Sequence, residues 1–454
     1  MGSVQPTNPE PDVLESERAS ATSPKESPVQ QTVRIGVLSA LNLTCGFATQ
    51  TYLLVALGVG VESDAYFAAL AIPQLFMFVV GDALLATFVP IFSGRDRDDL
   101  NREAWTFLSV FTLGFGLLCT AAMLTAPLWV GAIFPGFEGE GLELTIDMVR
   151  ITMLGFLFQP AASVLWAVYQ ARQSFYRPEV VVFFTGLSGL ASLAYFIPRY
   201  GVTSAAWVFT ARVWILVFAL LPAIGKFRKP SWSSAALRTS IRRSIPLLIG
   251  NGVGRLDEIV SRSLASLAPA GGLSLLAFAR LLYHGATVLI GKSITAPMIP
   301  ILSTLHKRGD EEGFRRTHYA RLRVVSTLPI VGVVALILLG PTPFEWLVGY
   351  GHVTEDNVET LWQLCVALSA ILIAVPIEGN LASAYYARGD TVLPAKATIF
   401  GFVAGTIAKF ALFFQFGLIG IALGAALQPV SGAAFLALFR RRGKRPETDP
   451  AASR

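Results

Sequence analysis

The sequence predicts an all-α integral membrane protein with about twelve transmembrane helices in two six-helix lobes. Hydrophobic residues make up 53% of the 454 residues and charged residues only 15%, against roughly 25% charged residues in an average soluble domain. Residues 104–137 contain no Asp, Glu, Lys or Arg, which exceeds the roughly 20 apolar residues that cross a bilayer core. An internal repeat divides the chain into two similar halves.

Hydropathy orders the expected elements along the chain. Residues 1–31 are rich in Ser, Pro, Glu and Gln and predict a disordered cytoplasmic tail, because such a segment buries too little apolar surface to fold. Residues 32–225 are expected to form an N-lobe and 244–440 a C-lobe, with a basic linker at 226–243 and a basic tail at 441–454. The spans are expected near 33–57, 65–92, 104–133, 145–171, 178–197, 202–224, 244–266, 272–303, 322–347, 357–387, 393–415 and 418–440.

The distribution of basic residues predicts the orientation. Lys and Arg of short loops stay on the cytoplasmic side, and here they follow the even-numbered spans, whereas the opposite loops hold Arg199 and the acidic Glu138, Glu140 and Glu143. Both termini are therefore expected in the cytoplasm. The net charge of +6 then suits anionic membrane lipids and requires no nucleic acid.

The repeat pairs the second span with the eighth. Residues 79–93 are echoed by 289–303, with Asp82 exchanged for Lys292. Further residues recur at one constant offset: Pro160, Tyr169, Ala171, Arg172, Pro178 and Gly201 as Pro376, Tyr385, Ala387, Arg388, Pro394 and Gly417. Each lobe has an even number of spans, so a pseudo-twofold axis is expected along the membrane normal. Duplicated lobes in lipid are typical of transporters.

Ionisable residues within spans are candidates for function, because each costs about 2.5–3.5 kcal/mol on insertion scales. Arg255 and Glu258 are three residues apart and are close enough to neutralise each other on one helical face. Asp257 points elsewhere and needs another partner, either Arg280 or Lys292.

Gating or coupling roles are proposed for four acids and one base. Asp82 and Lys292 occupy equivalent repeat positions, so an ion pair across the lobe interface would form a gate; the alternative is that each is satisfied within its own lobe. The full gating and coupling set is Asp82, Lys292, Asp257, Glu258 and Glu378.

Arginines provide the candidate head-group site. A planar guanidinium of Arg280 or Arg212 would bind an anionic head group such as a diphosphate. For Arg212 and Lys409 we expect helix packing or snorkelling instead. The head-group set is Arg280, Asp64 and Arg255, with Asp64 at the outer mouth of the second span.

The sequence shows no enzyme or cofactor signal. No phosphate-binding loop, zinc-protease motif or nucleophile elbow is present, and the four histidines and three cysteines are scattered. We therefore expect a transporter without cofactors, with possible energy sources in an ion gradient, the membrane potential or the substrate gradient.

Three segments carry a family resemblance. Residues 63–67 (SDAYF), 72–73 (IP) and 88–92 (FVPIF) resemble the signature of the MurJ/MviN family of lipid II flippases, within the multidrug/oligosaccharidyl-lipid/polysaccharide exporter superfamily. The resemblance implies a V-shaped pair of six-helix bundles like those of MATE transporters. It also implies an Arg-Asp pair in the first span, where this chain has Thr49 and Gln50, and an arginine in the second span, where it has Met77.

The resemblance implies a flippase of the bacterial cytoplasmic membrane. Its substrate would be lipid II or a related undecaprenyl-diphosphate-linked saccharide, moved by alternating access for peptidoglycan synthesis. A polysaccharide exporter of the O-antigen type or a MATE-like drug or cation antiporter is the alternative, followed by a non-transporting scaffold for envelope-synthesis enzymes. The expected partners are the lipid-linked oligosaccharide, membrane lipids and such enzymes, with the chain acting as a monomer.

Overall fold

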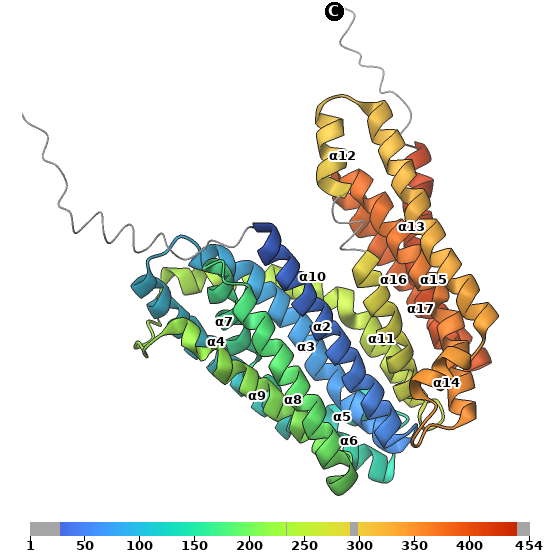
Figure 1. The fold of residues 1–454 in the computed structure, drawn as a ribbon, viewed down its shortest axis with the longest axis horizontal. Coiled ribbons are helices and arrows are strands. Elements are labelled where there is room, and N and C mark those ends of the chain that lie inside the picture. The colour runs from blue at the N-terminus through green and yellow to red at the C-terminus, as the bar shows by residue number, and fades with distance from the viewer. Residues whose placement is uncertain (1–27, 233, 291–297, 443–454) are drawn as a thin grey trace, which may run out of the picture.

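The computed structural model describes residues 28–232, 234–290 and 298–442, and these fold into α-helices with one short 3-10 helix (Figure 1). The N-terminal half contains α2 (Pro28–Leu57), α3 (Val61–Phe92), α4 (Arg97–Leu124), α5 (Ala126–Ile133), α6 (Gly139–Phe156), α7 (Gln159–Ala171), α8 (Tyr176–Tyr200), α9 (Thr203–Leu220) and η1 (Leu221–Ile224). The C-terminal half contains α10 (Ala235–Ser266), α11 (Gly272–Ile290), α12 (Met298–Lys307), α13 (Glu311–Leu339), α14 (Thr342–Val348), α15 (Glu355–Tyr386), α16 (Val392–Phe416) and α17 (Leu418–Arg442).

Ten helical segments in the described part of the chain are long and apolar enough to cross a membrane. They coincide with ten of the twelve predicted spans. The predicted spans at 244–266 and 272–303 are also helical where described, as α10 and as α11 with α12. Residues 291–297, between α11 and α12, lie outside the described residues, as do most of the predicted tails at 1–31 and 441–454. α10 is not among the ten because it contains seven Arg, Asp and Glu residues.

Prolines interrupt some spans and not others. The fourth span is two helices, since α6 ends at Phe156 and α7 begins at Gln159. Pro160 lies in the first turn of α7, where its missing N–H is not needed for a helical hydrogen bond. Pro73 lies inside the continuous α3 and Pro376 inside the continuous α15. Of these three prolines, only Pro160 thus lies where one helix ends and the next begins.

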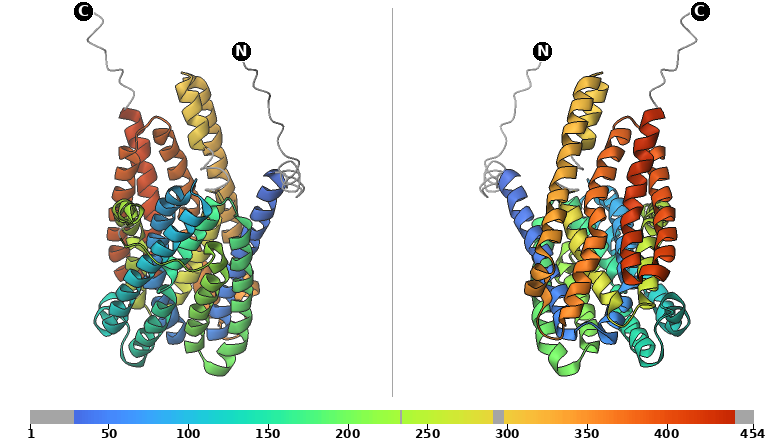
Figure 2. Two further views of the ribbon diagram at one scale, coloured as in Figure 1. Left: turned by 90° about the vertical axis from the view of Figure 1, so that its left-hand side faces the viewer. Right: turned by 90° about the vertical axis from the view of Figure 1, so that its right-hand side faces the viewer.

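The helices form two lobes, as predicted. The N-lobe consists of α2 to α9, the C-lobe of α11 to α17, and the two diverge toward the end of the molecule at which α17 ends (Figures 1 and 2). α10 joins them, because it packs along α3 of the N-lobe and also contacts α11, α16 and α17 of the C-lobe. Residues 235–243 of the predicted linker form its first turns.

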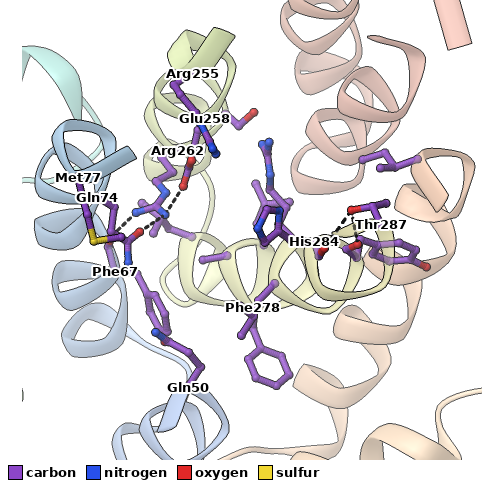
Figure 3. Close-up of a pocket in the computed structure, with 18 residues that line it drawn as sticks. Gln50, Phe67, Gln74, Met77, Arg255, Glu258, Arg262, Phe278, His284 and Thr287 are labelled. Carbon is purple, nitrogen blue, oxygen red and sulfur yellow. Dashed lines mark hydrogen bonds and ion pairs between the residues drawn. The ribbon is translucent and has the colours of Figure 1, made fainter. Parts of the chain in front are cut away.

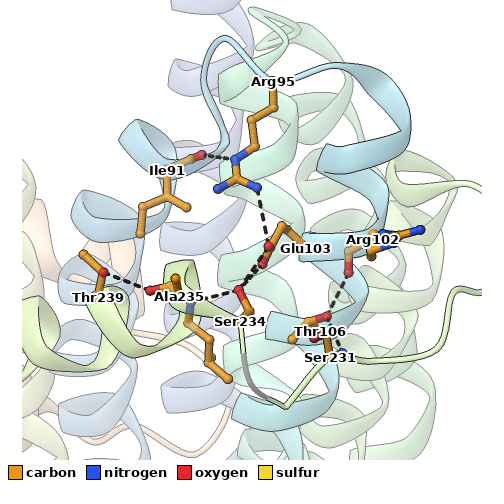
Figure 4. A network of polar contacts seen from close by, with 10 residues as sticks. Ile91, Arg95, Arg102, Glu103, Thr106, Ser231, Ser234, Ala235 and Thr239 are labelled. Carbon is orange, nitrogen blue, oxygen red and sulfur yellow. Dashed lines mark hydrogen bonds and ion pairs between the residues drawn. The ribbon is translucent and has the colours of Figure 1, made fainter.

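A polar network fixes the beginning of α10 to the N-lobe (Figure 4). Ser234 caps the helix by accepting the N–H of Leu237 at 3.3 Å. The Ser234 hydroxyl also donates to a carboxylate oxygen of Glu103 on α4 at 2.9 Å. Glu103 in turn pairs with Arg95 at 3.5 Å. The loop before α10 is thus held against the N-lobe.

Opposite the diverging end, the lobes contact each other at what we call the closed end, formed by residues 55–64, 268–274 and 349–353. The N–H of His352 donates to the carbonyl of Val55 at 3.2 Å. Gly271 has a φ of +92°, and a Cβ there would lie 2.1 Å from a methyl carbon of Val59. Only glycine satisfies both the left-handed backbone and this close approach.

Candidate functional site

A cavity of about 320 Å³ lies between the lobes (Figure 3). Its walls come from α2, α3, α10, α11 and α15. Three guanidinium groups reach it, from Arg255 and Arg262 on α10 and Arg280 on α11, together with the carboxylate of Glu258 and the imidazole of His284. We call this cavity the inter-lobe pocket. Its described charged side chains include more bases than acids, so it favours an anion.

The N-lobe wall of the inter-lobe pocket contains one position where the family resemblance implies an arginine, Met77, and one where it implies an aspartate, Gln50. Gln50 on α2 and Met77 on α3 both line it. The positive charge of the pocket therefore comes from α10 and α11, on the opposite wall. Sequence reasoning identified these two positions and named Arg255 and Arg280 of the opposite wall, which both line the pocket.

Arg262 connects the two walls, and the sequence analysis missed it. Its guanidinium donates to the carbonyl of Phe67 at 2.8 Å and to the side-chain oxygen of Gln74 at 2.9 Å, both on α3. It also pairs with Glu258, one turn earlier on α10, at 2.5 Å. The i,i+4 spacing of these two residues was visible in the sequence. The ion pair described for Glu258 is thus with Arg262, whereas Arg255 had been expected; Arg255 lines the same pocket.

Behind the C-lobe wall, a cluster of three charges holds Arg280, and we call it the C-lobe ion cluster. One carboxylate oxygen of Asp257 pairs with Arg280 at 3.1 Å, and the other pairs with the ammonium of Lys409 on α16. Arg280 is thereby confirmed as a partner of Asp257. Of the two roles expected for Lys409, snorkelling is wrong, because its side chain is 0% exposed and ion-paired, whereas helix packing holds, because it lies against Gly424 of α17.

Arg280 retains an unused donor. Its Nη2 pairs with Asp257, whereas its Nη1 is buried and has no hydrogen-bond partner among the described residues. A buried guanidinium nitrogen without an acceptor is costly. Since Arg280 lines the inter-lobe pocket, an anion bound there would supply that acceptor.

Asp64 lies away from the inter-lobe pocket, contrary to its expected head-group role. It is 3% exposed, and its two carboxylate oxygens accept the backbone N–H groups of Gly271 and Ser274 at 2.7 Å each. Asp64 thus binds the first turn of α11 across the lobe boundary. The N-terminus of a helix favours a negatively charged group of this kind. Asp64 therefore stabilises the closed end.

The remaining residues of the predicted gating set are Glu378, Asp82 and Lys292. Glu378 on α15 faces α17, where a Cβ on Gly432 would lie 2.2 Å from its carboxylate, and it does not line the inter-lobe pocket. Asp82 is part of α3, but Lys292 lies outside the described residues. The proposed gate between Asp82 and Lys292 stays a prediction.

The fold and site define a class: a polytopic membrane transporter with two lobes around a basic central pocket. Among solved structures, it is similar to "Lipid II flippase MurJ, inward closed conformation", with a TM-score of 0.79 and 18% identity over 90% of this chain and 87% of that one. An inward-facing MATE family multidrug transporter of the MOP superfamily gives a TM-score of 0.73 and 15% identity, covering 88% and 94%.

Sequence comparison specifies the family. The family model described as lipid II flippase MurJ matches residues 54–451. A probable lipid II flippase MurJ of Rhizobium tropici is 25% identical, covering 91% of this chain and 81% of the relative. A lipid II flippase MurJ of Burkholderia cenocepacia is 22% identical, covering 89% and 82%. The chain belongs to the lipid II flippase MurJ family.

Proposed function

We propose that this protein moves lipid II, or a closely related undecaprenyl-diphosphate-linked saccharide, across the bacterial cytoplasmic membrane. The observation that carries the proposal is Arg280, whose Nη1 is buried without an acceptor beside the inter-lobe pocket. A diphosphate offers oxygens to several guanidinium groups at once, and such charge-assisted hydrogen bonds are roughly twice as strong as neutral ones. Arg255 is the second residue assigned to this head-group site.

The position of the pocket favours alternating access. The N-lobe contributes α2 and α3 to its wall and the C-lobe contributes α11 and α15, so a rocking motion between lobes would expose a bound head group to either side. With both termini in the cytoplasm, as the basic loops indicate, the diverging end faces the cytoplasm. The structure then represents the state that loads substrate from the inner leaflet.

A gradient is the proposed energy source. The membrane potential acts on charges that move within the bilayer, with about 2.3 kcal/mol per elementary charge for 100 mV. The diphosphate and the C-lobe ion cluster are such charges, so coupling to the potential or to an ion gradient needs no cofactor. We further propose that the chain works as a monomer near envelope-synthesis enzymes.

Depletion of the protein in its host tests the proposal. We expect the lipid-linked precursor to accumulate in the cytoplasmic leaflet, as measured by its accessibility to a membrane-impermeant enzyme or label. Arg280→Ala should fail to restore export, while Arg321→Ala, on the exposed surface of α13, should restore it at equal protein level. Absence of precursor accumulation would refute the flippase, and full rescue by Arg280→Ala would refute the head-group site.

A drug or cation antiporter is the competing function within the same superfamily. Such a transporter needs a carboxylate for its cation, but Glu258, which is the acidic residue among the described lining of the inter-lobe pocket, is already paired with Arg262. The site therefore favours anionic cargo. Drug-efflux measurements in the depleted strain separate the two functions, because the flippase predicts unchanged efflux.

A further inference from the structure

A second cavity, of about 540 Å³, lies inside the N-lobe. It is enclosed by α2, α3, α7, α8 and α9, and we call it the N-lobe pocket. Gln50, Gln74 and Met77 line both this cavity and the inter-lobe pocket. The two cavities therefore adjoin, and a single elongated ligand could occupy both. Cavities of roughly 300–1,000 Å³ are the usual size of small-molecule sites.

The lining of the N-lobe pocket combines apolar residues with a set of polar side chains, and none of its described members is acidic. α7 presents one stripe of suitable groups to it, with Gln159, Ser163, Trp166 and Gln170 at helical spacing. Residues three or four apart lie on the same helical face. The stripe thus combines amides and a hydroxyl, which both donate and accept hydrogen bonds, with a large aromatic face.

These polar groups have unused hydrogen-bonding capacity. The side-chain amides of Gln159 and Gln170 have no hydrogen-bond partner among the described residues, and the buried side-chain oxygen of Gln50 has none either. Polar groups at membrane depth need a partner, which comes either from the protein or from what fills the cavity that they line. Their concentration around one cavity indicates a ligand that brings its own donors and acceptors.

Arg212 on α9 completes the wall. Its side chain lies against Gly189 of α8, where an added Cβ would be 3.2 Å from its Cδ. It makes no ion pair with a described carboxylate, so its donors are available to a carbonyl or carboxylate of a ligand. Helix packing or snorkelling was expected for Arg212; it does pack against α8, and it also lines the N-lobe pocket.

The corresponding place in the C-lobe is filled. By the constant offset of the repeat, Gly405 and Gln428 correspond to Gly189 and Arg212. A Cβ on Gly405 would lie 2.7 Å from the Cβ of Gln428, and one on Gly424 would lie 2.6 Å from the backbone nitrogen of Lys409. Thus α16 and α17 pack backbone to backbone, whereas the Arg212 side chain spaces α8 from α9. Among the described residues, the space that Arg212 opens between α8 and α9 therefore has no counterpart between α16 and α17.

We propose that the N-lobe pocket binds the saccharide of the lipid-linked substrate, while its diphosphate lies at Arg280 in the inter-lobe pocket. This inference rests on the proposed function and deepens it. Sugar hydroxyls match the glutamine amides, and a pyranose face packs on Trp166. An N-acetyl carbonyl or a sugar carboxylate matches Arg212. The substrate class is therefore a diphosphate-linked sugar with N-acetyl or acidic groups.

Two lipid probes test the proposal on the purified full chain in detergent, with affinities measured by native mass spectrometry. One probe is undecaprenyl diphosphate and the other is lipid II, which adds the sugars. The unmodified chain should bind lipid II at least about tenfold more tightly. Because each lost hydrogen bond costs about fivefold, Gln159→Leu with Gln170→Leu should weaken lipid II binding tenfold to thirtyfold. Binding of undecaprenyl diphosphate should stay within twofold.

Control variants make the outcomes distinct. Gln415→Leu, on the exposed surface of α16, should change neither affinity, and Arg280→Ala should weaken both probes equally. An unchanged preference for lipid II in the double variant would overturn the sugar site and leave the proposed function standing. Failure of the unmodified chain to bind either probe would overturn both. If the double variant does not fold, Arg212→Met provides the same comparison.

Discussion

The C-lobe ion cluster yields a quantitative prediction about stability. Lys409→Met removes one partner of Asp257, but Arg280 remains at 3.1 Å from the other carboxylate oxygen. The carboxylate stays compensated, so the expected loss is about 1–3 kcal/mol of unfolding free energy. Asp257→Asn instead leaves the ammonium of a 0%-exposed lysine without its counter-charge, which should cost about 3–5 kcal/mol.

The double variant isolates the interaction. Asp257→Asn with Lys409→Met leaves neither of these charges buried without its partner, and Arg280, whose side chain is 29% exposed, can be solvated from the pocket. The loss should therefore fall short of the sum of the single losses by about 2 kcal/mol or more, as expected for coupled neighbours.

Reversible unfolding in mixed detergent, followed by tryptophan fluorescence, measures these free energies. Lys396→Met, an exposed lysine of the same helix, is the matched control and should lose less than about 0.5 kcal/mol. The reasoning is refuted if Lys409→Met costs as much as Asp257→Asn, or if the two losses simply add.

Three further predictions concern the closed end, the wall of the inter-lobe pocket and the packing of α16 on α17. Asp64→Ala removes the acceptor of two backbone amides and should weaken the closed end by about 2 kcal/mol, measured as faster labelling of a cysteine placed there; unchanged labelling would contradict it. Arg262→Lys cannot reproduce three guanidinium contacts and should lower flipping in proteoliposomes about tenfold, whereas a wild-type rate would exclude this role. Gly424→Ala forces a Cβ to within 2.6 Å of the Lys409 nitrogen and should cost about 1–3 kcal/mol, while Gly332→Ala, with open space around it, should not destabilise the fold.

Predictions from the sequence succeeded where the signal is local. Apolar length and the constant offset of the repeat are properties of the chain itself, so the spans and the two lobes followed from them. The start of α10 within the predicted linker at 226–243 was harder to predict from the sequence. Ser234, which caps α10, is held in place by Glu103 of α4, a helix far away in the sequence. A cap of this kind is decided by tertiary packing.

Predictions about individual charges were mixed for a related reason. The pairing of Asp257 with Arg280 was one of two options, since both candidates lay on the neighbouring span. Lys409 was expected to serve in helix packing or snorkelling, but the rotation of α16 also turns its ammonium toward Asp257. Asp64 looked like a mouth residue, yet it binds two amides of α11.

The sequence by itself therefore determined the class of fold, the family, and which residues bring charge into the membrane, because hydropathy, repeats and signature segments are written along the chain. Only the tertiary structure decided which charges meet, that Arg262 joins Arg255 and Arg280 in the basic wall of the inter-lobe pocket, and that the N-lobe contains a cavity with polar lining residues where α16 and α17 of the C-lobe are packed together. Those features depend on the rotation and spacing of helices far apart in sequence, and side-chain periodicity within one helix does not specify them.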